Sequence, residues 1–238
     1  MPRPGERMEN HISSWLKYLQ EPEKIEHRQK HRPFVTISRQ SGAYGTTIAD
    51  ELVGHLNRHE RRGDIAWAAL DKELVQKVIE DHKLPASFEA YFAQSSTSRL
   101  QDILEDFFGV HPPRETLVHK MSETVLRLAS VGHVVLIGQG AGIISRQLHG
   151  GTHIRLIGSL GKRVAHMVEY LKLPEKQARE HVLKEARDRR EHIKRYFKAD
   201  ITDPSLYDVV INTDSVDLQH AVALIAGMVA ARRVDHQR

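Results

Sequence analysis

The residues best suited to chemistry lie in a glycine-containing turn that follows a short apolar run. Against the phosphate-loop pattern G-x-x-x-x-G-K-S/T, Gly45 takes the second glycine position and Thr47 the hydroxyl position, whereas Gln40 and Thr46 replace the first glycine and the lysine. Backbone N–H groups from Gly42 to Thr47 can still hold phosphate, and the Thr47 hydroxyl can ligate Mg²⁺. The alternative is an ordinary strand–helix turn in which Thr46 or Thr47 is a helix cap.

A second glycine cluster runs from Gly138 to Gly142 and invites a dinucleotide-binding interpretation. That fold requires an acidic residue about 20 positions further on, which holds the ribose. No Asp or Glu occurs between Gly138 and Glu169. The sequence therefore argues against a dinucleotide site.

A basic segment late in the chain is the third candidate. Arg187, Arg190 and Lys194 share a helical face at i, i+3 and i+7. Such a run is usually a solvated face. The sharper alternative is a mobile lid whose arginines close on phosphates and neutralise charge during phosphoryl transfer. Asp71 is a further candidate, because it follows an apolar run and so lies where ligands bind in open α/β sheets; its alternative role is a helix N-cap.

These residues need a scaffold, and the hydrophobic pattern predicts one. Five short apolar runs indicate buried strands, which alternate with segments of helical periodicity, so a parallel sheet with helices on both faces is expected. The predicted strands are 34–38, 65–70, 133–138, 152–157 and 207–212. The predicted helices are 9–20, 46–60, 71–82, 139–147, 159–172, 174–197 and 216–232, with a helical insertion over 83–132.

The bulk composition narrows the function classes. The 238 residues include 40% hydrophobic residues and no cysteine, which suits one α/β domain with insertions and excludes cysteine-ligated metal. No apolar run is long enough to cross a bilayer, so a cytoplasmic protein without a membrane role is expected. The net charge of +4 suits an anionic small molecule and makes nucleic-acid binding the weakest hypothesis.

Several motifs together resemble those of the cytidylate kinase-like family, a branch of the P-loop nucleoside monophosphate (NMP) kinases. They occur in the family's order and cover roughly residues 34–230. The matching segments are Ile37-Ser38-Arg39-Gln40 with Gly42 and Gly45, Ile48-Ala49, Asp71-Lys72-Glu73-Leu74, Val135-Leu136-Ile137-Gly138, Arg195-Tyr196-Phe197 and Tyr207-Asp208-Val209-Val210-Ile211-Asn212-Thr213-Asp214.

The resemblance implies a P-loop kinase-like α/β/α sandwich with a five-stranded parallel sheet. It implies a kinase domain (34–238), which carries an NMP-binding insertion (71–131) and a lid (185–203). Residues 1–33, predicted as an N-terminal helix and charged connector, lie outside the resemblance. It also implies that ATP and Mg²⁺ are cofactors, that a nucleotide or other phosphorylated small molecule is the partner, and that phosphoryl transfer to a monophosphate is the activity. The N-terminal helix suggests a homodimer contact, although a monomer fits equally.

The resemblance also implies residue roles. The phosphate loop would comprise Ser41, Gly42, Ala43, Tyr44, Gly45, Thr46 and Thr47, with Mg²⁺ on Thr47. Asp71 and Gln139 would contact the acceptor. The charge-neutralising arginines would be Arg163, Arg189, Arg190 and Arg195, with the choice among the lid arginines open.

Two departures from the family pattern concern activity. Thr46 stands where the kinases carry lysine, and Gln139 stands where they commonly carry arginine. Arg39, counted among the phosphate-binding residues, or a lid arginine can take the place of the lost charge. Two hypotheses follow: an active kinase with relocated cations, or a catalytically impaired nucleotide- or anion-binding regulatory module on the same fold.

Overall fold

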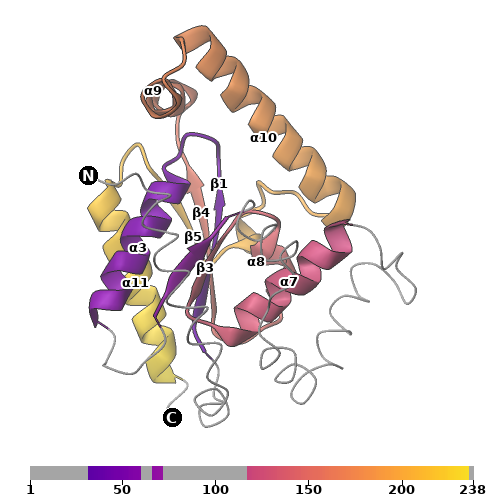
Figure 1. Cartoon of the computed structure of the whole chain (residues 1–238), viewed down its shortest axis with the longest axis vertical. Coiled ribbons are helices and arrows are strands. Elements are labelled where there is room, and N and C mark those ends of the chain that lie inside the picture. The colour runs from indigo at the N-terminus through magenta and orange to yellow at the C-terminus, as the bar shows by residue number, and fades with distance from the viewer. Residues whose placement is uncertain (1–31, 60–65, 72–116, 236–238) are drawn as a thin grey trace.

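The computed structural model describes residues 32–59, 66–71 and 117–235, and these build a three-layer α/β/α sandwich (Figure 1). The central sheet has five parallel strands in the order β2-β3-β1-β4-β5. Their bounds are β1 Phe34–Arg39, β2 Ala68–Leu70, β3 Val134–Ile137, β4 Gly151–Ile157 and β5 Val209–Asn212. The expected fold class is confirmed.

Continuous apolar runs form the inner strands because both faces of this sheet are covered. In β1, Phe34 packs on one face and Val35 and Ile37 on the other, and all three are fully buried. The register places Val35 beside Val135 of β3 and Thr152 of β4. β1 is therefore the central strand, and the turn that follows it lies in the middle of the carboxyl edge of the sheet.

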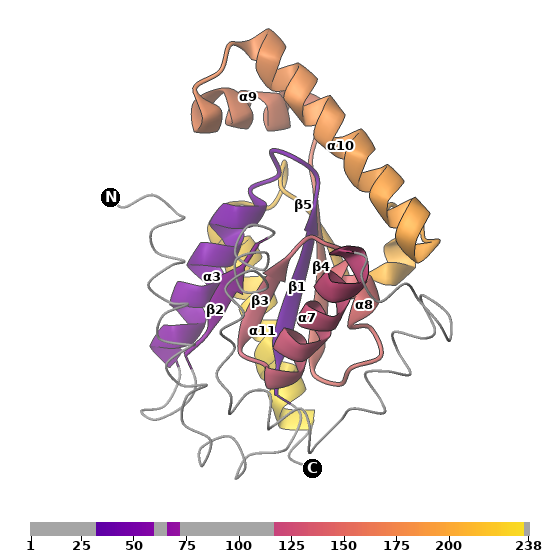
Figure 2. The same cartoon turned by 45° about the vertical axis from the view of Figure 1, so that its right-hand side comes forward.

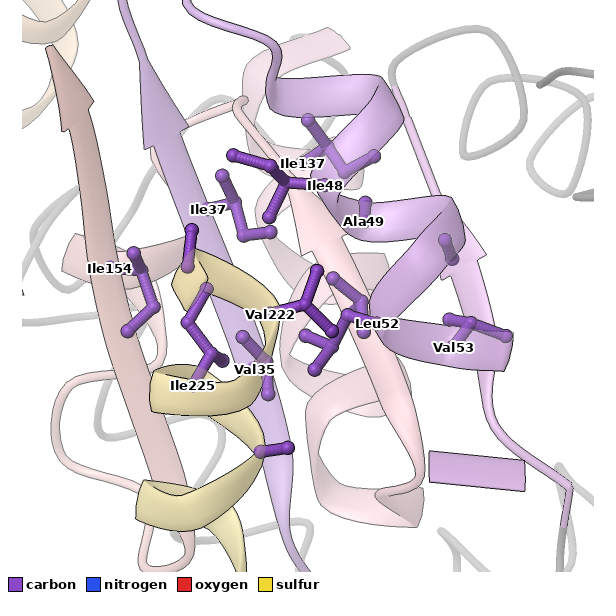
Figure 3. Close-up of a cluster of buried hydrophobic side chains, with 14 of the residues drawn as sticks. Val35, Ile37, Ile48, Ala49, Leu52, Val53, Ile137, Ile154, Val222 and Ile225 are labelled. Carbon is purple, nitrogen blue, oxygen red and sulfur yellow. The ribbon is translucent and has the colours of Figure 1, made fainter. Parts of the chain in front are cut away.

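Helices α3 (Gly45–His59) and α11 (Leu218–Asp235) cover one face of the sheet. Ile48, Leu52 and Val53 of α3 meet Val222 and Ile225 of α11 over the side chains of β1, β3 and β4 (Figure 3). This is the apolar stripe at helical spacing that the sequence predicted, and it fixes the first turn of α3 at the end of β1.

The other face carries α7 (Leu117–Val131), the short α8 (Ala141–Ile144) and the C-terminal end of α10 (Glu175–Phe197). Ile193 and Phe197 of α10 belong to the core cluster on this face. The other end of α10 pairs with α9 (Leu160–Leu171), where Val164, Met167 and Val182 form a separate small core. The two helices make a hairpin that extends beyond the carboxyl ends of the strands (Figure 2).

Element bounds differ from the expected ones mostly by a few residues. The predicted helix 139–147 is the largest difference, because α8 ends at Ile144. Beyond Ser145 the backbone turns by i to i+3 hydrogen bonds, from Arg146 N to Ile143 O and from Leu148 N to Ser145 O. The predicted helices 9–20 and 71–82 and most of the insertion 83–132 lie outside the described residues. None of the helices described here is long and apolar enough to cross a membrane.

Candidate active site

The turn between β1 and α3 has the backbone shape of a phosphate loop. Gly42 and Tyr44 adopt left-handed conformations, with φ of 84° and 57°. A Cβ atom at Gly42 would lie 2.4 Å from the Arg163 carbonyl oxygen, so only glycine fits there. The Ala43 N–H donates to the Gln40 carbonyl at 3.1 Å, which closes the turn.

The first turn of α3 carries backbone N–H groups that no described residue accepts from. Helix α3 begins at Gly45, so Thr46 and Thr47 lie inside its first turn and are not its N-cap. The N–H groups of Gly45, Thr46 and Thr47 donate to no group in the part of the chain that the structure describes. Free N–H groups at the positive end of a helix make an anion-binding site.

Helix α9 holds the loop from outside. Arg163 donates from Nη1 to the Ser41 carbonyl at 3.2 Å and from Nε to the Gly158 carbonyl at 2.9 Å. His166 Nδ1 donates to the Gly42 carbonyl at 2.9 Å, and its ring stacks on Tyr44 with centroids 3.8 Å apart. Burial lowers the pKa of Arg163, and the charge of Asp214 partly offsets this.

Arg163 therefore reaches the predicted loop, but its hydrogen bonds go to backbone carbonyls, one in the loop (Ser41) and one after β4 (Gly158). Sequence reasoning missed His166, which no motif marks. Gln40, which stands in place of the first glycine, also has a bracing contact: its Oε1 accepts from the Gly158 N–H at 2.9 Å.

A pocket of about 350 Å³ opens beside the loop, at the carboxyl ends of β1 and β3 and under α10. This is the edge at which ligands bind in open α/β sheets. Its volume falls within the usual range for small-molecule sites. The pocket is lined by Ile37, Ser38, Arg39, Gly138, Gln139, Gly140, Ala141, Gly142, Ile143, Glu185, Asp188, Arg189, His192, Ile193, Ile201 and Tyr207.

Arg39 crosses from the loop into this pocket through a slot between two glycines. A Cβ atom at Gly45 would lie 2.7 Å from Arg39 Cγ, and one at Gly138 would lie 1.9 Å from Arg39 Nη1. Burial and the neighbouring charge of Arg189 lower the pKa of Arg39 to about 10, against the opposing effects of Asp71 and Glu185. The side chain thus carries a positive charge into a poorly hydrated place.

Of the predicted lid arginines, Arg189 is the one that lines the pocket. It forms an ion pair with Glu185 at 2.6 Å and reaches the Arg39 carbonyl at 3.5 Å. Burial lowers its pKa, and Glu185 opposes this. Arg190 and Arg195 are exposed on α10 and do not line the pocket.

A polar network that sequence reasoning missed stands at another wall of the pocket. Buried Arg155 on β4 donates to Ser38 Oγ at 2.8 Å and lies against the ring of Tyr207, with its guanidinium carbon 5.5 Å from the centroid. The Tyr207 hydroxyl lies 3.3 Å from Ser38 Oγ and donates to the Ile201 carbonyl at 2.9 Å. The register of the sheet pairs Ser38 with Arg155, so this network follows from the strand order.

The two predicted acceptor contacts occupy different places. Gln139 lines the pocket, in a left-handed turn with φ of 55°. Asp71 follows β2, is half-buried and is near enough to Arg39 for its charge to raise the arginine's pKa. The helix that Asp71 was expected to cap lies outside the described residues.

The residues fit a Mg²⁺ ion that is held mainly by phosphate oxygens. The described segments contain no group of three His, Cys, Asp or Glu side chains that could hold a metal by themselves. The Thr47 hydroxyl lies in the first turn of α3 and makes no hydrogen bond within these segments. Mg²⁺ usually takes one or two protein ligands alongside phosphates and water, so a single hydroxyl is a suitable donor.

The model of the cytidylate kinase-like family matches residues 34–215, which span the loop, the pocket and all five strands of the sheet. The chain belongs to the cytidylate kinase-like family. A search of curated protein sequences found no significant match.

One solved structure resembles this family member in fold with a TM-score above 0.5, and two further matches score lower. An uncharacterized protein from Eubacterium ventriosum shares 17% identity with a TM-score of 0.61, over 84% of this chain and 99% of its own. Shikimate kinase from Bacteroides thetaiotaomicron shares 11% with a TM-score of 0.42, over 83% and 98%. TT1252 from Thermus thermophilus shares 17% with a TM-score of 0.43, over 84% and 98%.

Proposed function

We propose that this cytidylate kinase-like protein is an ATP-dependent phosphotransferase, acting on a nucleoside monophosphate or a similar small acceptor in the cytoplasm. The observation that carries the proposal is the adjacency of two sites: the open amides of Gly45, Thr46 and Thr47, and the pocket of about 350 Å³ on the other side of Arg39. One suits the donor's phosphates and the other an acceptor. Adjacent donor and acceptor sites are what phosphoryl transfer requires.

Each site has a distinct task in this proposal. The loop amides would bind the β- and γ-phosphates of ATP. Mg²⁺, when bound, would be held by the Thr47 hydroxyl and would neutralise the developing charge. The acceptor lies against the apolar side chains of Ile193 and Ile201, with polar contacts to Gln139 and, from the sheet edge, Asp71. The overhanging α10, with residues 185–203 as the lid, excludes water from the reacting groups.

Arginines must supply the positive charge that Thr46 does not. Arg163 contacts the loop, and Arg189 lines the pocket. Arg190 and Arg195 lie exposed on the same helix, so in this proposal they reach phosphate only when the lid closes. A single charge-stabilising donor is worth roughly 3–4 kcal/mol in the transition state, so the missing lysine predicts slow turnover.

The existing partners of these arginines favour a second function. In it, the protein is a regulatory module that binds a nucleotide or anion without turnover. Arg163 is bonded to the carbonyls of Ser41 and Gly158, and Arg189 is paired with Glu185. Transition-state stabilisation requires groups that are free to meet developing charge, and a binding module does not.

One experiment separates the two functions. Purified protein is incubated with ATP, Mg²⁺ and a panel of nucleoside monophosphates, and ADP formation is measured for the wild type and for Thr46→Lys. Mg²⁺-dependent ADP formation that rises on restoring the lysine supports the kinase. Thermal stabilisation by nucleotide without ADP formation in either protein supports the module, and a flat response in both assays overturns both.

A further inference from the structure

The Arg39 guanidinium enters the pocket within electrostatic reach of Asp71 and Glu185. The Arg39 guanidinium makes no hydrogen bond or ion pair with any described residue, although it carries five donors. Of the acids that line the pocket, Glu185 is paired with Arg189, and Asp188 is exposed on α10. The remaining donors of Arg39 therefore suit an oxyanion brought by a ligand.

The path of the Arg39 side chain between Gly45 and Gly138 shows where its guanidinium lies. The stem of Arg39 passes Gly45, one residue before the position of the missing lysine, and its head lies at Gly138, one residue before Gln139. The guanidinium therefore lies at the end of β3, beside Gly138. Glycine at 138 leaves room for this, since a Cβ atom there would overlap Arg39 Nη1.

We infer that Arg39, which enters the pocket from strand β1, is the cation that binds the oxyanion of the acceptor. This inference assigns Arg39 to the acceptor, whereas the sequence interpretation counted it among the contacts for the donor's phosphates. This inference rests on the proposed function, which assigns the pocket to the acceptor. The ligand class is a small molecule with a phosphoryl group, since a guanidinium binds phosphate through two parallel hydrogen bonds.

The neighbourhood of Arg39 supports a phosphoryl group. Arg189 adds a second guanidinium, whose repulsion with Arg39 a bound anion would relieve. The N–H groups of Gln139 and Gly140 follow Gly138 in consecutive left-handed residues, and neither donates to a backbone carbonyl of the described chain. The pocket thus offers backbone donors next to the side-chain cation.

The test uses inorganic phosphate as the probe and NMR to separate the two anion sites. In a ¹H–¹⁵N titration of the full chain at low salt, phosphate at the pocket shifts the amides of residues 138–140, and phosphate at the loop shifts those of residues 45–47. Arg39→Met is expected to weaken the pocket site by about tenfold to a hundredfold and leave the loop site unchanged, because a hydrogen bond to a charged group is lost. Arg58→Met, an exposed arginine on α3, is the matched control.

The double variant Arg39→Met with Gln139→Arg keeps the result interpretable if the single variant is destabilised. It is expected to recover pocket binding to within a few-fold of wild type, because the cation returns from the next residue along the slot. Pocket shifts that persist in Arg39→Met, or that never occur in the wild type, overturn the inference. The kinase assay is independent of this test. If phosphate binding depends on Arg39 but no turnover is found, the proposed function is refuted and the inference about Arg39 stands.

Discussion

The loop and the pocket lie side by side at the same edge of the sheet, but they offer different kinds of ligand-binding groups. The loop offers backbone amides and is held by carbonyl contacts to Arg163 and His166. The pocket offers side chains, with Arg39 entering from β1 and Arg155 behind Ser38. A backbone site tolerates changes in side chains, and a side-chain site does not. The lost lysine therefore says less about phosphate binding at the loop than about the rate of transfer.

The largest test of this contrast is Gly42→Ala, which should damage the loop alone. The new methyl group meets the Arg163 carbonyl at 2.4 Å and strains a φ of 84°, so we expect a loss of about 3–4 kcal/mol in the free energy of unfolding. Urea denaturation measures it. Gly227→Ala is the control, because nothing lies within 4 Å and Ala is expected to stabilise helix α11 by roughly 0.5–1 kcal/mol. Equal effects at both glycines would refute the tight contact between α9 and the loop.

Acid should weaken the support beneath the pocket. His153 is buried under Gly142 and hydrogen-bonded to Thr36 at 2.8 Å. Burial lowers its pKa from 6.5 to about 4, aided by Arg232 and Arg146 and opposed by Asp208. Between pH 6.5 and about pH 4, His153 is therefore protonated in the unfolded chain and neutral in the folded chain.

The sign follows from this difference. The free energy of unfolding should fall as pH drops from 6.5 toward 4, by on the order of 2–3 kcal/mol, with no contribution from this group above pH 6.5. Denaturation at several pH values measures the slope. His153→Asn should flatten it, and exposed His220→Asn should not; a wild-type slope in His153→Asn would contradict the assignment.

Tyr207→Phe tests the pocket without touching the loop. It removes a hydroxyl that donates to the Ile201 carbonyl at 2.9 Å and lies near Ser38. We expect weaker acceptor binding by about tenfold, or roughly 1–1.5 kcal/mol, because the polar wall loses its fixed geometry. Nucleotide titration should give an unchanged affinity for ATP, and a parallel loss of ATP affinity would show that the two sites are not separate.

The smallest expected effect belongs to the loop. His166→Phe keeps a ring against Tyr44 but loses the donor to the Gly42 carbonyl. We expect ATP binding to weaken by about 0.5–1 kcal/mol, the net worth of one hydrogen bond, with acceptor binding unchanged. Calorimetric titration with ATP and with the acceptor measures the two affinities. His181→Phe, on the far helix of the hairpin, is the matched substitution that should change neither.

The fold could be predicted because its determinants are local in the sequence. The runs at 34–38 and 133–138 are buried on both faces, and an uninterrupted apolar run has few other uses. The loop could be predicted from its context, since strand, glycine turn and helix follow one another directly. Asp71 was singled out because it follows an apolar run, and Gln139 because of the family resemblance.

The pocket's network could not be predicted, since its members meet only through the sheet. Ser38 and Arg155 are 117 residues apart and become neighbours when β4 pairs with β1, and Tyr207 reaches them from beyond the lid. The direction of Arg39 likewise depends on two glycines that no periodicity connects. Arginines 189 and 190 are equivalent in the sequence, and only the helix's rotation about its axis turns Arg189 toward the pocket.

Helix α10 has a mechanical consequence. Its 23 residues make a rod of roughly 35 Å, fixed in the sheet's core at Phe197 and joined to α9 at the other end. The rod is a lever. A tilt of about 5° at Phe197 would carry the far end some 3 Å, about the length of a hydrogen bond. A ligand that shifts Arg189 slightly could thus change, through α9, how firmly the phosphate loop is gripped.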